Sequence, residues 1–149
     1  NLADNTANNI DITGVQLEVG SVATDFEHES FNATLTKCLR YYEKMIATAG
    51  TVKRIGVGVV QSTSVAVGVV LFDVRKRANP SITFNHADTG IAVQHGGGGA
   101  TSTSLAAAHI QDTSFHIQVT QSTAPFTVGF GVLFYTNLVA SFVEISADL

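Results

Sequence analysis

The chain has 149 residues, of which 45% are hydrophobic and only 13% are charged, and its formal net charge is −4. This length suits a single domain with its own hydrophobic core. The charged share is about half of the usual quarter, so we expect a surface rich in Ser, Thr, Gly, Asn and Gln, or a surface buried against other chains. The acidic balance argues against nucleic-acid binding, and no apolar run reaches the roughly 18 residues of a membrane helix.

Cysteine and basic residues are scarce in the sequence. Cys38 is the only cysteine, which excludes an intrachain disulfide and a cysteine-based metal site. The only basic cluster, residues 75–77, is predicted to be a solvated strand end. The chain opens Asn1-Leu2-Ala3-Asp4 without Met, and we therefore expect it to be a piece of a longer protein.

Residues 1–28 begin polar and then alternate. Ile10, Ile12, Val15, Leu17 and Val19 are separated by polar residues, and the alternation breaks at Thr13-Gly14, where glycine indicates a bulge or bend. The pattern predicts one or two strands, too few to form an independent sheet.

Residues 30–46 change to the period of an amphipathic helix. Apolar residues recur at Leu35, Cys38, Leu39, Tyr42, Met45 and Ile46, with steps of three and four. Ser30 or Asn32 is suited to cap the start of this helix, and Gly50 is a plausible stop signal. Leu35, Cys38, Tyr42 and Met45 form a narrow seam, which packs either on the strands of the same chain or on copies of itself around a symmetry axis.

Residues 51–149 are predicted to form seven or eight strands. Ile55, Val57 and Val59 alternate with glycines, and later runs centre on residues 65–72, 82–84, 91–93, 115–119, 126–134 and 143–149. Residues 105–108 fit a short helical turn or a strand equally well. Many short strands with turn residues between them predict an antiparallel β-sandwich, jelly-roll-like, with one short N-terminal amphipathic helix.

Two strands carry more apolar surface than one chain can cover. Residues 65–72 are apolar on both faces, and the stripe of residues 126–134 has Gly129 and Gly131 opposite its Phe and Val side chains. A bare glycine face allows another backbone or a large side chain to approach closely. We therefore predict that neighbouring subunits cover these faces in an oligomer.

Two unlike motifs occur in a specific order. The segment ITGVQLEVGSVATDFE at residues 12–27, followed by LTKCLRYYEK at residues 35–44, resembles a stretch that recurs in bacteriophage tail fibre proteins. FDVRKRANPSITF at residues 72–84 and ISADL at residues 145–149 are similar to later parts of that family. Leu39 departs from the family, which often has Gln there, and the upstream domain is reduced to its last strand or two.

The resemblance implies three regions and a homotrimer. Residues 1–28 would be the terminal strand or strands of an upstream β domain like a carbohydrate-binding module. Residues 29–50 would be a helical linker and trimer seam, and residues 51–149 a β-sandwich receptor-binding tip. The expected function is host attachment from the virion: a tail fibre distal domain that binds a surface polysaccharide or outer-membrane receptor of the bacterium, joined to upstream fibre domains and without membrane insertion.

The patterns that suggest catalysis are incomplete. His95-Gly96-Gly97-Gly98-Gly99 resembles an oxyanion-hole loop, but no Gly-x-Ser-x-Gly elbow accompanies it, and a flexible loop is the better interpretation. The five histidines are too widely spaced for a local metal pair. A glycosidase needs two carboxylates about 5–10 Å apart, and after residue 50 the only acids are Asp73, Asp88, Asp112, Glu144 and Asp148. We expect no enzyme activity, no metal and no cofactor.

The residues available for glycan binding are mostly polar. There is no Trp, and Tyr135 is the only Tyr after residue 50, although aromatic rings are the usual sugar platforms. The candidate ligand-binding residues are Asn85, His86, Asp88, Gln94, His95, His116, Tyr135 and Asn137. Two other functions stay open: a purely structural trimerisation or capping domain of a fibre, and an esterase or glycosidase that trims polysaccharide.

Overall fold

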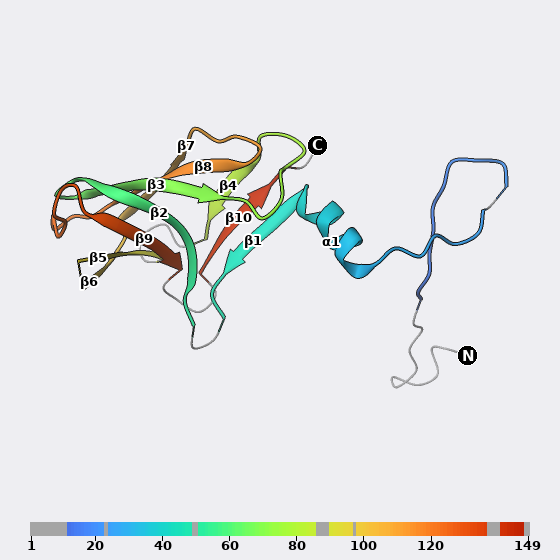
Figure 1. Ribbon diagram of the computed structural model, residues 1–149, viewed down its shortest axis with the longest axis horizontal. Helices are drawn as coiled ribbons and strands as arrows, with labels where there is room; N and C mark the ends of the chain where they lie inside the picture. Colours follow the sequence, from blue (N-terminus) through green and yellow to red (C-terminus); the bar gives the residue numbers. More distant parts are fainter. Residues whose placement is uncertain are drawn as a thin grey trace, which may run out of the picture. The chain divides into compact units, whose positions relative to one another are not determined.

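The computed structural model describes residues 12–22, 24–48, 51–85, 90–96, 98–136 and 141–147. The chain divides into two units, Asn1–Thr34 and Leu35–Leu149. The described part is mostly β, with ten antiparallel strands and one short helix (Figure 1). No helix in this part is both long enough and apolar enough to cross a membrane.

The described residues of the first unit do not form the predicted strands. Residues 12–22 and 24–30 contain no strand, and Val15, Leu17 and Val19 are exposed. The segment instead closes on itself through side chains: the Thr24 N–H and hydroxyl donate to the Glu18 carboxylate at 2.5 and 2.6 Å. A strand requires a neighbour for its backbone hydrogen bonds, so alternation alone was a wrong guide here. Ile10 lies outside the described residues.

The helix is shorter than predicted. α1 (Phe31–Leu39) begins after Ser30, whose hydroxyl accepts a hydrogen bond from the Ala33 N–H at 3.3 Å, as expected of an N-cap. It ends at Leu39, and β1 (Tyr42–Ile46) follows at once. The prediction of helix to residue 46 was wrong, because the inward position between Tyr42 and Met45 is occupied by a charged residue, Glu43, which hides the strand alternation.

The predicted seam is therefore not a single stripe. Leu35 and Cys38 are exposed on α1, Tyr42 is exposed on β1, and Met45 is buried in the core on the opposite face of β1. Helical spacing cannot place Tyr42 and Met45 together on a strand, where they point to opposite faces.

Three strands form the smaller sheet. Its order is β1 (Tyr42–Ile46), β10 (Phe142–Ser146), β4 (Ser81–Phe84). Met45, Val143 and Phe84 lie side by side in the register and point inward, where Val143 and Met45 are buried. The predicted closing strand at residues 143–149 is confirmed as β10, with residues 148 and 149 outside the described part.

Seven strands form the larger sheet. Its order is β6 (Gly98–Thr101), β5 (Ile91–His95), β9 (Gly131–Thr136), β2 (Lys53–Ser62), β3 (Val65–Leu71), β8 (Ser114–Thr120), β7 (Ser104–Ala108). Residues 105–108 thus form a strand, and His95, Gly98 and Gly99 of the predicted flexible loop lie in the paired strands β5 and β6. Only the end of the predicted 126–134 stripe is a strand, because Gly129 has φ +85°, a left-handed conformation that interrupts extended backbone.

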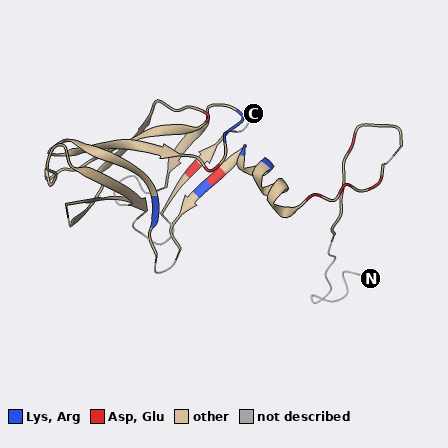
Figure 2. Cartoon of the chain, viewed as in Figure 1, with Lys and Arg blue, Asp and Glu red and all other residues tan. Residues whose placement is uncertain are grey.

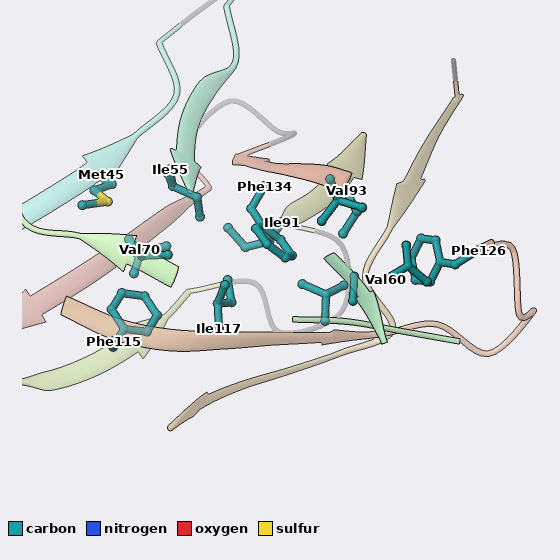
Figure 3. Close-up of a cluster of buried hydrophobic side chains, with 14 of the residues drawn as sticks. Met45, Ile55, Val60, Val70, Ile91, Val93, Phe115, Ile117, Phe126 and Phe134 are labelled. Carbon is teal, nitrogen blue, oxygen red and sulfur yellow. The ribbon is translucent and has the colours of Figure 1, made fainter. Parts of the chain in front are cut away.

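The two sheets share one hydrophobic core. It combines Met45, Val143 and Ile145 of the smaller sheet with residues of β2, β3, β5, β8 and β9. Figure 3 shows Met45, Val70 and Phe115 at one end of this core and Val60, Val93 and Phe126 at the other.

A pair of glycines on neighbouring strands makes room for the largest core ring. Gly58 and Gly68 are direct partners in the β2–β3 register, and a Cβ atom on either residue would collide with the Phe134 ring and with the backbone of the opposite strand. The close approach therefore occurs at Gly58 and Gly68, by a side chain of the same chain, whereas nothing lies within 4 Å of the Cβ positions of Gly129 and Gly131, where it was predicted.

A buried ion pair joins residues 35–44 to residues 72–84. The Lys76 ammonium lies 2.6 Å from the Glu43 carboxylate, with side-chain exposures of 0% and 4%. Lys76 also donates to the Leu39 carbonyl at 2.6 Å, and the Asp73 N–H donates to Glu43 at 3.2 Å. The prediction that residues 75–77 are fully solvated was wrong for Lys76, because its ammonium is satisfied inside the protein.

Candidate ligand-binding site

The outer face of the seven-stranded sheet, turned away from the core, has an apolar centre. We call this set the apolar outer face: Val57, Val59, Val67, Val69, Leu71 and Leu133. Leu133, Val57 and Val69 are cross-strand neighbours in one row. Val57, Val69 and Leu71 are 63%, 46% and 68% exposed, which is unusual for adjacent large apolar side chains on a sheet.

Charge on this sheet is confined to one place. The seven strands contain no Asp or Glu, and their only Lys or Arg residues are Lys53 and Arg54 at the start of β2. Figure 2 shows the sheet almost entirely uncharged apart from the beginning of this strand. Arg54 is exposed and, among the described residues, has no ion-pair partner.

A β-bulge decides which way Arg54 points. The β2–β9 register shifts between Arg54 and Gly56, so Arg54 pairs with Tyr135 and Gly56 pairs with Phe134. Phe134 faces the core, so Tyr135 and its partner Arg54 face outward. The bulge also places Ile55 in the core, and the predicted single face of Ile55, Val57 and Val59 was therefore wrong.

Arg54 and Tyr135 line an open hollow of about 360 Å³ at the border of the apolar outer face. Its lining is Val52, Arg54, Gln94, Gly98, Gly99 and Tyr135. Gly98 and Gly99 contribute backbone without side chains to this lining, and a Cβ atom on Gly99 would lie 3.0 Å from the Tyr135 hydroxyl. A second hollow, of about 460 Å³, shares Gln94 and extends toward Val57 and Leu133.

The eight predicted ligand residues do not form one site. Gln94 and Tyr135 lie together in the first hollow. His95, next to Gln94 in sequence, lines the second hollow together with Gln94 and packs edge-on against the Phe126 ring, with centroids 5.0 Å apart. His116 occupies the same row of the outer face as Gln94, yet four strand spacings, about 19 Å, separate them.

The remaining predicted residues are elsewhere or are not described. Asn85 belongs to the smaller sheet, where its side-chain oxygen accepts a hydrogen bond from the Phe142 N–H at 2.7 Å. This bond gives Asn85 a structural role at the end of β4. His86, Asp88 and Asn137 lie outside the described residues.

Two carboxylates that follow residue 50 have structural partners. Asp112 accepts from the Arg75 guanidinium at 2.7 Å, and Glu144 accepts from the Tyr42 hydroxyl at 2.6 Å. This second bond, together with burial and the charge of Glu144, raises the pKa of Tyr42. No group of three or more His, Cys, Asp and Glu residues that would hold a metal exists among the described residues.

Sequence analysis missed Arg54 and Gly99. Arg54 was passed over because strict alternation from Val57 assigns it to the face it would share with Gly56 and Gly58. Gly99 was assigned to a flexible loop. The signal that was available is the isolation of Lys53-Arg54, the only charges between residues 49 and 72.

Comparison with known protein families, with curated proteins and with solved structures found no match to this chain.

Proposed function

We propose that this chain is the distal module of a bacteriophage tail fibre, a homotrimer that binds a glycan on the bacterial surface without enzymatic activity. In this proposal β1 and the strands that follow it act as a jelly-roll-like β-sandwich, and the upstream segment continues into the fibre. The four segments that resemble tail fibre proteins support it, and the Glu43–Lys76 ion pair joins two of them, residues 35–44 and 72–84, within the fold.

The observation that carries the proposal is the apolar outer face. A sheet face that meets water normally carries polar side chains, whereas this one presents Val57, Val69 and Leu71 largely exposed. Second and third copies of this chain cover this face in the proposed trimer. The face contains no charged side chain, so copies can bury it against one another without removing charges from water.

Host binding is supported by the border of that face. The hollow around Gln94 and Tyr135 offers an amide, a phenol and bare backbone, the mixture of polar groups and ring surface that sugar hydroxyls require. Binding at one such open site is expected to be weak. Three copies on one fibre strengthen weak contacts by about 100-fold or more through avidity.

Two measurements on the purified chain test the proposal. Light scattering should give a mass three times the 15.7 kDa of one chain, and the trimer should bind bacterial cells in a way that free surface polysaccharide competes. A 15.7 kDa particle at micromolar concentration, or no binding across a broad panel of bacterial strains and polysaccharides, would overturn the proposal.

The apolar outer face equally favours a second candidate, a structural trimerisation or capping module of a fibre. Assembly needs only the apolar side chains, whereas adsorption also needs the polar border. A stable trimer that binds no cell and no polysaccharide would favour this second function.

A further inference from the structure

The hollow beside Arg54 combines three chemical features that rarely meet on this sheet. Arg54 supplies a guanidinium, Tyr135 supplies a ring with a hydroxyl, and Gly99 contributes backbone without a side chain. Gln94 adds an amide at the side.

The charge of the hollow points to an anion. Arg54 faces outward from the bulge, and the seven strands offer it no acidic residue. Asp73 and Glu43 line a separate, smaller hollow that Arg54 also borders. Neither of them forms an ion pair with the Arg54 guanidinium, so its donors are available to a ligand.

The geometry of the guanidinium favours a planar oxyanion. Its N–H groups form a fixed fork that matches both oxygens of a carboxylate. Because the guanidinium and the carboxylate are both charged, this pairing is stronger than a hydrogen bond between neutral groups. Arg54 is therefore suited to the carboxylate of an acidic sugar.

Tyr135 and Gly99 supply the surface for the rest of the sugar. A tyrosine presents an apolar ring for the C–H face of a pyranose and a hydroxyl for its polar edge. The Gly99 backbone is bare, and any larger residue would crowd the Tyr135 hydroxyl. Gln94 can both donate and accept hydrogen bonds with sugar hydroxyls.

We propose that this hollow binds a carboxylate-bearing saccharide, with Arg54 pairing to the carboxylate and Tyr135 contacting the ring. The inference rests on the proposed glycan-binding function and specifies the ligand class and site. His116 on β8 lies outside this site.

The test compares matched ligands on the full chain. The probes are oligosaccharides of alternating glucuronate and N-acetylhexosamine, the same oligosaccharides after reduction of each carboxyl to a primary alcohol, and a panel of neutral bacterial polysaccharides. Affinities are measured by calorimetry or surface plasmon resonance at low salt. Reduction of the carboxyl should weaken binding at least about tenfold, the loss expected for one charge-assisted hydrogen bond.

The test also compares matched variants. Arg54→Gln should remove the preference for the acidic form, while Lys53→Gln, which changes the net charge equally on the same strand but lies outside the hollow, should keep it. Gly99→Val should fill the hollow and weaken binding of the acidic probe, with an unchanged circular dichroism spectrum as evidence of folding.

The outcomes separate the inference from the function on which it rests. Equal binding of the acidic and reduced probes, or a full preference in Arg54→Gln, overturns the acidic-sugar site while binding of any glycan leaves the proposed function standing. If neither acidic nor neutral glycans bind, both fall.

Discussion

The outward side chains of the two sheets differ in the interactions that they make. On the smaller sheet the outward side chains satisfy one another: the Tyr42 hydroxyl donates to Glu144 at 2.6 Å, and the Lys44 ammonium lies 3.6 Å above the Phe142 ring. On the larger sheet the outward centre is Val57, Val69 and Leu71, with no polar partner among them. The outer face of the smaller sheet is therefore suited to solvent, whereas the outer face of the larger sheet requires a partner that covers it.

The inner faces differ in the same sense. The smaller sheet directs a charged residue, Glu43, into the core, where Lys76 neutralises it. The larger sheet directs apolar residues and two glycines inward, so that Phe134 fits by shape alone. Polar pairing therefore specifies the small sheet, and apolar shape specifies the large one.

The largest expected effect concerns the outer faces. Val57→Lys with Val69→Lys should convert the proposed trimer into a monomer, because six lysines would be forced into a shared apolar interface. Ile46→Lys places the same change on the outer face of the smaller sheet, where residue 46 is exposed, and should leave the mass unchanged. Light scattering gives both masses. If the Val57/Val69 variant remains trimeric, the large sheet is not the interface.

The buried ion pair should give the next largest effect. Lys76→Met leaves the Glu43 carboxylate buried without its cation, and loss of one partner of such a pair costs about 3–5 kcal/mol. Urea unfolding measures this change. The double variant Glu43→Leu with Lys76→Met should be more stable than Lys76→Met alone, because no unpaired charge remains. If the double variant is no more stable than Lys76→Met, packing of the Lys76 side chain, and not its charge, stabilises the small sheet.

At the glycine pair Gly58 and Gly68, which lies against Phe134, the free energy of unfolding should depend on side-chain volume and not on charge. Gly68→Ala places a methyl group against the Phe134 ring and the β2 backbone, and such overpacking costs about 1–3 kcal/mol in the free energy of unfolding. Gly131→Ala is the matched control on β9, since nothing lies within 4 Å of its Cβ position. The control should change stability by less than about 0.5 kcal/mol. A neutral Gly68→Ala would mean that the two strands have room to separate.

Sequence patterns predicted the larger sheet better than the smaller one for a physical reason. Residues 65–71 are apolar on both faces, so their pattern indicates a strand whichever face is buried, and β3 with its exposed Val69 matches that prediction. β1 was missed because Glu43 occupies an inward position. Its partner Lys76 lies 33 residues away, so the sequence around Glu43 does not predict that pairing.

The candidate site was predicted only in part. Gln94 and Tyr135 were identified as polar and aromatic residues of the second half, and they meet in one hollow. Arg54 was not identified, because a bulge at Ile55 reverses the alternation, and a bulge depends on the register with β9 rather than on the sequence of β2 alone. His116 and Asn85 were grouped with them by residue type, which carries no information about which strand of which sheet they occupy.

The smallest expected effect tests whether the outer face of the small sheet is indeed self-satisfied. The hydrogen bond to Glu144, then burial and the charge of Glu144, raise the pKa of Tyr42 above its usual 10.0. The folded pKa exceeds the unfolded one, so the bond contributes stability below about pH 10 and loses it as pH rises through the folded value.

Tyr42→Phe should therefore lower the free energy of unfolding by about 0.5–1 kcal/mol at neutral pH, at the low end for a hydrogen bond because the pair is solvent-exposed. The difference from the unsubstituted chain should shrink as pH rises above 10. Glu144→Gln is the matched control: it keeps an acceptor but removes the charge, and it should return the Tyr42 pKa, measured by tyrosinate absorbance, toward its ordinary value. A stability difference that is constant from neutral pH to pH 11 would mean that the Tyr42 ring contributes by packing alone, and the contrast between the two outer faces would then rest only on the exposed valines.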